Sequence, residues 1–264
     1  MGSWAATRVR DAAYALVTLL LVCALVEALS RFEVVPSDSF PPLTQTFATL
    51  GDQLGEHEFW ANVRDTMKGW AYGLGIATAL AVPLGIAIGA SELAYRAVRP
   101  IVEFLRPIPS VALIPLAVLV YGTGFSSKLF LVVFASFWPV LIQTLYGMRD
   151  VDPVMIDTAR SYGLGRLRRL LWVTLPGALP YVATGLRISS SVALILAVTA
   201  ELVIGAPGLG AAITIANSHG NMRLMYALII ATGILGWLLS TLFTQGERRV
   251  LHWHASQRRV RPAR

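Results

Sequence analysis

Ionisable side chains are scarce inside the apolar runs of this 264-residue chain, so each one there is a candidate for chemistry. Glu201 stands in such a run, where a carboxylate is costly to bury unless it faces water or polar partners. It is therefore a candidate gate residue on a solute pathway; an interfacial carboxylate, or one hydrogen-bonded between subunits, is the alternative. Hydroxyls in these runs could contact a passing solute or pack between helices, and the candidates are Ser136, Ser190 and Thr199.

Patterns that carry catalysis or bind metal are missing from the sequence. No GxxxxGK[ST] phosphate loop exists, because neither Lys68 nor Lys128 follows the required glycines. Cys23 lies alone in an apolar run, so there is no disulfide framework. His252 and His254 form a lone HxH beside a basic tail, which is more typical of an interfacial segment than of a metal site. We expect no enzymatic activity, cofactor or metal in this chain alone.

Arginine is dense in the stretch from Asp150 to Pro180, which lies between two long apolar runs. Asp152 followed by Pro153 is a good helix start, and Gly163 supplies a left-handed stop about ten residues later. One side of this short helix is apolar, with Val154, Met155, Thr158, Ala159 and Tyr162, and the other side carries Asp157, Arg160 and Ser161. A second, basic helix is expected from Arg166 and should end before Pro176.

This segment resembles the EAA loop of ABC-importer permeases: Glu-Ala-Ala, a Gly four residues after the second Ala, and an apolar-x-Leu-Pro element beginning ten residues later. The matching positions are Asp157, Thr158, Ala159, Gly163, Val173, Leu175 and Pro176, with Asp157 in place of Glu and Thr158 in place of Ala. The flanking sequences LRPIPSVALIPLAVLVYGTG and AELVIGAPGLG resemble the nitrate, sulfonate, taurine and bicarbonate branch of these permeases.

Composition independently indicates an integral membrane protein. Apolar residues make up 55% of the chain and charged residues 14%, which is too apolar for an ordinary soluble domain. The net charge of +7 could suggest nucleic-acid binding, but 20 of the 22 basic residues are Arg, mostly between apolar runs or at the termini. Positive loops on the cytoplasmic face of a membrane explain them more simply.

About six membrane-spanning helices are expected from the apolar runs. The first could instead be a signal peptide, but no convincing cleavage site follows it. Gly85 and Gly89 in the second run form a GxxxG pair suited to close helix packing. The runs are 12–26, 69–90, 107–127, 129–148, 181–204 and 224–246.

The connections between these runs are expected to be mostly non-spanning. Residues 32–68 form a polar connection that is partly helical near 43–54, and 91–106 form a basic connection. The run at 107–127 contains Pro107, Pro109 and Pro115, so an irregular start and a kink are expected there, next to a cavity or other protein. A Gly-rich connection precedes the last run.

Arginine distribution predicts the orientation. With both termini, the 91–106 connection and the 149–187 region in the cytoplasm, 17 Arg lie inside, and the remaining basic residues, Arg31, Arg64, Lys68, Lys128 and Arg223, lie outside. Both termini are therefore expected to be cytoplasmic, together with the EAA-like loop.

The resemblance implies one all-α transmembrane permease domain over residues 1–264, of the type I ABC importer kind, in a bacterial cell membrane. It implies a homodimer with two copies of an ATPase subunit, which holds Mg-ATP, and an extracytoplasmic solute-binding protein. The residues it assigns to ATPase coupling, within the loop 150–180, are Asp157, Thr158, Ala159, Arg160, Gly163, Gly165, Arg166, Leu175 and Pro176.

Two other classes of protein stay open. An ion-coupled secondary transporter would need ionisable coupling residues near mid-membrane and internal repeats, and the spans carry almost no ionisable groups and no visible repeat. A membrane scaffold would need neither a pathway nor an ATPase. The solute cannot be identified from these residues, because in this family specificity mostly rests with the binding protein.

Overall fold

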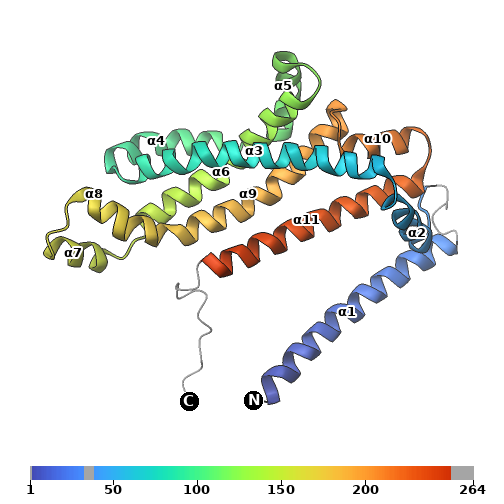
Figure 1. Cartoon of the computed structure of the whole chain (residues 1–264), viewed down its shortest axis with the longest axis horizontal. Coiled ribbons are helices and arrows are strands. Elements are labelled where there is room, and N and C mark those ends of the chain that lie inside the picture. The colour runs from blue at the N-terminus through green and yellow to red at the C-terminus, as the bar shows by residue number, and fades with distance from the viewer. Residues whose placement is uncertain (1, 33–38, 251–264) are drawn as a thin grey trace. The chain divides into compact units, whose positions relative to one another are not determined.

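The computed structural model describes residues 2–32 and 39–250, and every regular element in that part of the chain is helical (Figure 1). This confirms the all-α fold class. The elements in chain order are α1 Gly2–Arg31, α2 Leu43–Gln53, α3 His57–Gly89, α4 Glu92–Leu105, the 3₁₀ turn η1 Ser110–Leu113, α5 Ile114–Tyr121, α6 Phe125–Arg149, α7 Pro153–Ser161, α8 Arg166–Arg169, the π turn η2 Leu170–Thr174, α9 Leu175–Ile204, α10 Leu209–Ser218 and α11 Met222–Val250.

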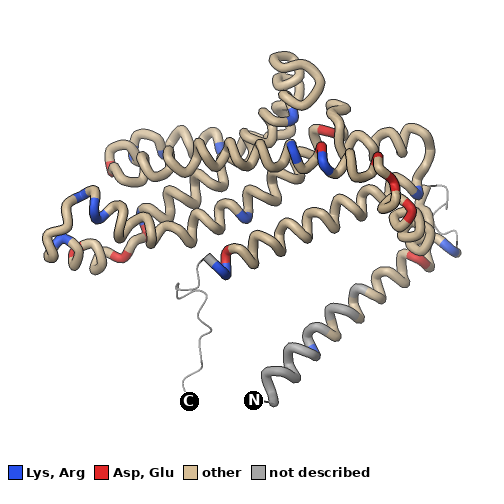
Figure 2. Tube along the Cα trace, viewed as in Figure 1, with Lys and Arg blue, Asp and Glu red and all other residues tan. Residues whose placement is uncertain are grey.

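Four helical stretches among the described residues are long and apolar enough to cross a membrane: α3, α6, the stretch 166–218 that contains α9, and α11. The bent pair of α4 and η1–α5 makes a fifth if it counts as one span. The first apolar run of the sequence lies in α1, part of whose side chains fall outside the described residues. Long stretches of α3, α6, α9 and α11 carry no charged residue (Figure 2).

Contacts divide the chain into two compact units, of which the first comprises residues 1–60 and 212–231. In this unit the carboxylate of Glu27 in α1 accepts hydrogen bonds from the hydroxyl of Thr44 at 2.8 Å and from its backbone N–H at 3.2 Å. The ring of Phe40 meets Tyr226 edge to face, with centroids 5.3 Å apart. As predicted, the 32–68 connection is partly helical, in α2 and the start of α3.

The second unit comprises residues 61–211 and 232–264, and its centre is the packing of α6 between α3 and α9. A Cβ on Gly89 would lie 2.5 Å from the Met148 side chain, and one on Gly85 would lie 2.8 Å from Thr144. Real Cβ atoms do not come that close, so glycine is required at both positions for α3 to approach α6. The predicted role of the GxxxG pair in close helix packing is confirmed.

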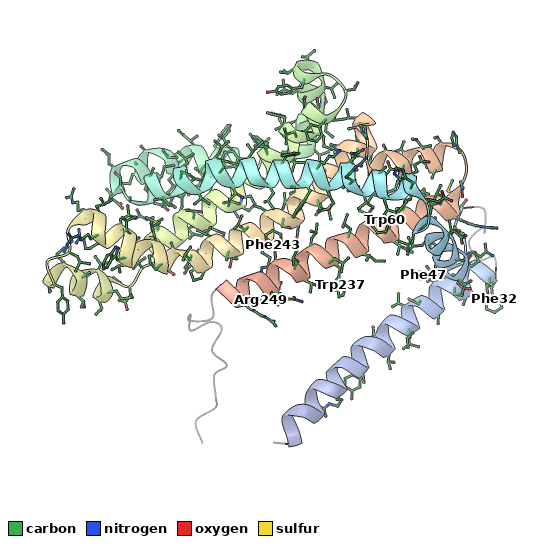
Figure 3. All side chains as sticks on the ribbon, viewed as in Figure 1. Phe32, Phe47, Trp60, Trp237, Phe243 and Arg249 are labelled. Atoms are coloured by element: carbon green, nitrogen blue, oxygen red, sulfur yellow. The ribbon has the colours of Figure 1, made fainter. Side chains whose placement is uncertain are left out.

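Within the second unit, the C-terminal part of α11 packs on α3 and α9. The Phe243 ring, labelled in Figure 3, meets Trp70 of α3 edge to face with centroids 6.1 Å apart. Leu239 joins a buried cluster with Leu194 and Val198 of α9. Trp237, which Figure 3 also labels, is 66% exposed and therefore suited to a lipid environment.

The third apolar run has the irregular start that its prolines predict and is not one continuous span. Its main helical part, residues 110–121, lies at 81° to α4, and its last three residues, 125–127, already belong to α6. Pro107 and Pro109 stop the helix at the bend, whereas Pro115 occupies the first turn of α5, where its missing N–H costs nothing. The basic connection 91–106 is itself helical: it folds as α4, with the Ser91 hydroxyl accepting a hydrogen bond from the Ala94 N–H at 3.3 Å.

Two further boundaries differ from the sequence prediction. The basic helix that begins at Arg166 does not end before Pro176 but continues through the π turn into α9. Pro176 lies in the first turn of α9, where its lack of an N–H is tolerated. The Gly-rich connection after residue 204 contains a helix, α10, whose first N–H groups have distant partners described below.

Candidate functional site

The EAA-like loop begins with the capped helix that its sequence predicts. The Oδ1 atom of Asp152 accepts a hydrogen bond from the Val154 N–H at 2.8 Å, and Pro153 occupies the first helical position. Asp150, two residues before this cap, is also anchored, because the Tyr181 hydroxyl of α9 donates to its carboxylate. The start of α7 is therefore fixed both by its own cap and by the adjoining span.

The other end of α7 closes in a Schellman motif. Gly163 has φ of 74°, the Leu164 N–H donates to the Ala159 carbonyl at 3.0 Å, and the Gly163 N–H donates to the Arg160 carbonyl at 2.9 Å. This double closure satisfies carbonyls that would otherwise lack partners and needs a left-handed residue at Gly163. The predicted stop is confirmed.

The apolar residues of α7 divide between two directions. Val154, Met155 and Tyr162 are 69%, 54% and 82% exposed and make up the outward face of α7. Ala159, which the sequence analysis placed on the same side, is 7% exposed and turns toward its own chain. Ala159 therefore lies on the inner side of α7, together with the half-buried Ile156.

Polar residues of α7 are solvated. Asp157 and Arg160 pair at 3.3 Å, with side chains 70% and 68% exposed, so the pair adds little stability. Thr158 is exposed as well. These three residues are accessible to a partner but are not organised into a site of their own.

The return segment joins α7 directly to the fifth apolar run. Gly165 caps α8 in an extended conformation, and the helix runs from Arg166 to the half-buried Leu175 and exposed Pro176. A groove of about 620 Å³ lies under the loop, between Ile156, Arg166 and Thr174 and the ends of α3 and α6 at Gly89 and Met148. The loop therefore lies beside the adjacent ends of these two helices while remaining continuous with α9.

Glu201, the candidate gate residue, is completely buried and fully hydrogen-bonded. Its Oε1 atom pairs with the Lys128 Nζ at 3.0 Å, and its Oε2 atom accepts from the Thr66 hydroxyl and the Gly210 N–H, both at 2.9 Å. The Lys128 ammonium donates in addition to the carbonyls of Asp65 at 3.1 Å and Pro207 at 2.9 Å.

The same cluster holds the start of α10. The Leu209 N–H donates to the Thr66 hydroxyl at 2.9 Å, so Thr66 and the Glu201 carboxylate together bind two N–H groups that a helix start leaves unsatisfied. A Cβ on Gly208 would lie 2.2 Å from the Glu201 Cδ atom, so the loop can wrap the carboxylate only with glycine there.

Sequence reasoning missed Lys128 and Thr66. From the sequence, Lys128 was expected only to lie on the outer side of the membrane, with no partner assigned. It is 1% exposed, and the carboxylate of Glu201 and two backbone carbonyls satisfy all three of its donors. The available signal was that Lys128 is one of only two lysines and borders an apolar run on the α6 side.

The hydroxyl candidates separate into two places. Ser190 and Thr199 both line a cavity of about 460 Å³ between α9 and α11, and the buried Ser190 hydroxyl has no hydrogen-bond partner among the described residues. Ser136 is buried between α6 and α9, where its carbonyl accepts from the Ser189 hydroxyl at 2.7 Å. Ser136 and Glu201 do not line this cavity.

No group of three or more His, Cys, Asp or Glu side chains within residues 2–32 and 39–250 is arranged to hold a metal ion. His252 and His254 lie outside the described residues. The arrangement therefore offers a projecting loop, a buried ion-pair cluster and a hydroxyl-lined cavity.

Residues 81–250 match the family model described as "Binding-protein-dependent transport system inner membrane component". The chain is 31% identical over 242 residues to the taurine transport system permease protein TauC of Escherichia coli K12, covering 90% of this chain and 88% of that protein. It is 29% identical over 222 residues to the nitrate import permease protein NrtB of Leptolyngbya laminosa, covering 84% of this chain and 79% of that protein.

Two solved structures share the fold. The methionine ABC transporter MetNI, in an inward-facing conformation, aligns with a TM-score of 0.62 and 19% identity over 72% of this chain and 94% of its own. An amino acid ABC transporter with histidines aligns with a TM-score of 0.62 and 19% identity over 73% of this chain and 94% of its own. At this identity the match supports the helical architecture.

Proposed function

Because this chain belongs to the family of binding-protein-dependent transport system inner membrane components, we propose that it forms the translocation pathway of an ATP-driven importer for a small organic or inorganic anion. Its relatives include permeases named for taurine, nitrate and aliphatic sulfonates, which share an oxyanion group. Specificity for one of these rests with a separate extracytoplasmic solute-binding protein.

In this proposal a separate ATPase subunit binds the chain at α7. This assignment rests on the outward face of α7, where Val154, Met155 and Tyr162 are exposed although the helix is closed at both ends. A short rigid helix with an apolar face can seat in a cleft on a soluble protein. Mg-ATP would be held by that subunit and no cofactor by this chain.

Two permease chains form the pathway as a homodimer, with two ATPase subunits, one under each α7. The stretch after α7 supports a mechanical role, since it continues without a break from Arg166 into α9. Movement of α7 by ATP-driven closure of the ATPase pair is thereby transmitted to a membrane span. Both termini and α7 lie on the cytoplasmic side, where the arginines concentrate.

Site-directed cross-linking tests this assignment. In a Cys23→Ser background, Met155→Cys and Tyr162→Cys are treated with a heterobifunctional reagent that joins a thiol to a nearby amine, in membranes from the native host. Both positions should capture the ATPase, whereas Ile156→Cys, on the half-buried side of α7, should not. An ion-coupled transporter or a scaffold would give no ATPase adduct at any of the three positions.

A further inference from the structure

Helix α4 presents three different faces along its length. One face packs on α3 and α6: Tyr95, Val98 and Val102 lie against a buried cluster that includes Ile88 and Leu145. A second face is apolar and exposed, with Leu93, Ile101 and Phe104 at 80%, 56% and 75% exposure. The third face, here termed the charged stripe, consists of Glu92, Arg96, Arg99, Glu103 and the C-cap residue Arg106.

The charged stripe runs alongside α6 rather than across its end. Figure 1 shows α4 lying lengthwise beside α3 and α6. Arg99, Glu103 and Arg106 line a cavity of about 90 Å³ together with residues of α6 that include Ile142. Ile142 precedes Arg149, the last residue of α6, by seven positions, or about 10 Å of helix. Because residues 129–148 carry no charge, the stripe extends into the apolar layer.

Charges at that depth are costly unless they face water or polar partners. The 81° bend that follows α4 leads to the same conclusion, because irregular backbone at membrane depth is tolerated only where protein covers it or a water-filled cavity adjoins it. A helix lying flat on the membrane surface would instead cross the ends of the spans. The placement of α4 therefore favours a charged stripe that faces an aqueous part of the pathway.

Positive charge predominates around this stripe. Glu92 pairs with both Arg96 and Arg149, and Arg99 pairs with Glu103, each at 2.7 Å. The guanidinium of Arg106 has no ion-pair partner among the described residues and borders the cavity. Four arginines thus face two glutamates, which leaves an excess that attracts anions.

We propose that the charged stripe of α4 lines the cytoplasmic half of the pathway, with Arg99 and Arg106 forming an exit-side site for a small oxyanion. The proposal rests on the importer function and names residues that would contact its anionic solute on the exit side. The cavity beside these residues has room for several waters or one small oxyanion. Arg106 offers a guanidinium fork to the anion, and Glu103 holds Arg99 in position and limits how tightly the anion is retained.

Thiol labelling tests the charge of this site without knowledge of the solute. Single cysteines are introduced at Glu103 and, as the lipid-facing comparison, at Ile101, in a Cys23→Ser background in inside-out membrane vesicles. Impermeant methanethiosulfonates should modify Glu103→Cys but not Ile101→Cys. Relative to a free thiol, the anionic reagent should be favoured over the cationic one by at least about fivefold, the effect of one unit charge at about 4 Å in water.

Removing the arginines then tests their part in that preference. Adding Arg99→Gln and Arg106→Gln to the Glu103→Cys chain should abolish the preference for the anionic reagent. Adding Arg96→Gln should leave most of it, since Arg96 lies two turns from position 103, about 10 Å along the helix. An unreactive Glu103→Cys, or a preference that survives loss of Arg99 and Arg106, would overturn the proposal.

Depth measurement separates the pathway from a surface helix. Spin labels at Leu93, Ile101 and Phe104 are compared by their accessibility to oxygen and to a water-soluble nickel complex. The pathway arrangement predicts increasing depth from Leu93 to Phe104, over about 16 Å; equal depth at all three positions would show a helix on the membrane surface and refute the proposal. Neither labelling experiment needs the ATPase, so their failure is distinguishable from failure of the importer assignment.

Discussion

Replacement of Gly163 by alanine is expected to weaken coupling through backbone strain alone. Gly163 has φ of 74°, and a Cβ there would meet no atom within 4 Å, so alanine introduces no clash. A left-handed conformation costs a non-glycine residue about 1–2 kcal/mol. That energy lowers the equilibrium constant between closed and open α7 by a factor of about 5–30, which sets the upper limit of the loss of correctly closed chains.

Gly165→Ala is the matched control. It lies two residues away, is equally free of neighbouring atoms, and has φ of −67°, which alanine adopts without strain. Gly163→Asn should be milder than Gly163→Ala because asparagine tolerates the left-handed region. Gly163→Asp adds a charge to nearly the same shape, so a larger defect than that of Gly163→Asn measures electrostatic interference with the partner.

The assay compares ATPase retention in detergent, ATP hydrolysis and anion uptake for the complexes reconstituted in liposomes. Gly163→Ala and Gly163→Asp should be expressed and inserted normally but should lower uptake per ATP hydrolysed, with Gly163→Asp more severe than Gly163→Asn. Equal behaviour of Gly163→Ala and Gly165→Ala would show that the Schellman closure of α7 is not needed for coupling.

Two further predictions concern packing and the buried ion pair. Gly73→Ala should lower the thermal unfolding temperature, because its Cβ would lie 2.3 Å from Val132, at a cost of about 1–3 kcal/mol, whereas Gly75→Ala has open space and should not; equal unfolding temperatures would contradict the close approach of α3 to α6. Glu201→Gln should lower the free energy of unfolding by about 3–5 kcal/mol, because it leaves Lys128 buried and unpaired. Adding Lys128→Met should restore part of that stability. A double-mutant cycle with no coupling energy between the two positions would contradict the ion pair.

Local signals were sufficient to predict α7. Each end of α7 is set by residues close to it in sequence: Asp152 and Pro153 at the start and Gly163 at the end. The sequence therefore specifies both helix ends without tertiary context. Alternation of apolar and charged runs likewise identified α3, α6, α9 and α11, because long uncharged segments are dictated by bilayer thickness.

Features that depend on distant residues were not predictable in this way. Thr66 and Glu201 accept hydrogen bonds from the first N–H groups of α10. Thr66 lies 143 positions before Leu209, whose N–H donates to its hydroxyl. Lys128 and Glu201 are 73 positions apart, so the sequence around either residue does not indicate its partner. The helical structure of α4 was not predicted for another reason. Charged residues separate its two apolar faces, so its sequence resembles a basic connection, and only the packing on α3 and α6 shows which face is buried.

Copurification shows directly whether this chain works together with an ATPase subunit. The protein is tagged at the C-terminus, extracted from its native membrane in mild detergent, and its partners are identified and quantified by mass spectrometry. An ATPase subunit is expected at one copy per permease chain, with two permease chains in the particle. Recovery of this chain without an ATPase, under conditions that preserve other ABC transporters from the same membrane, would contradict it.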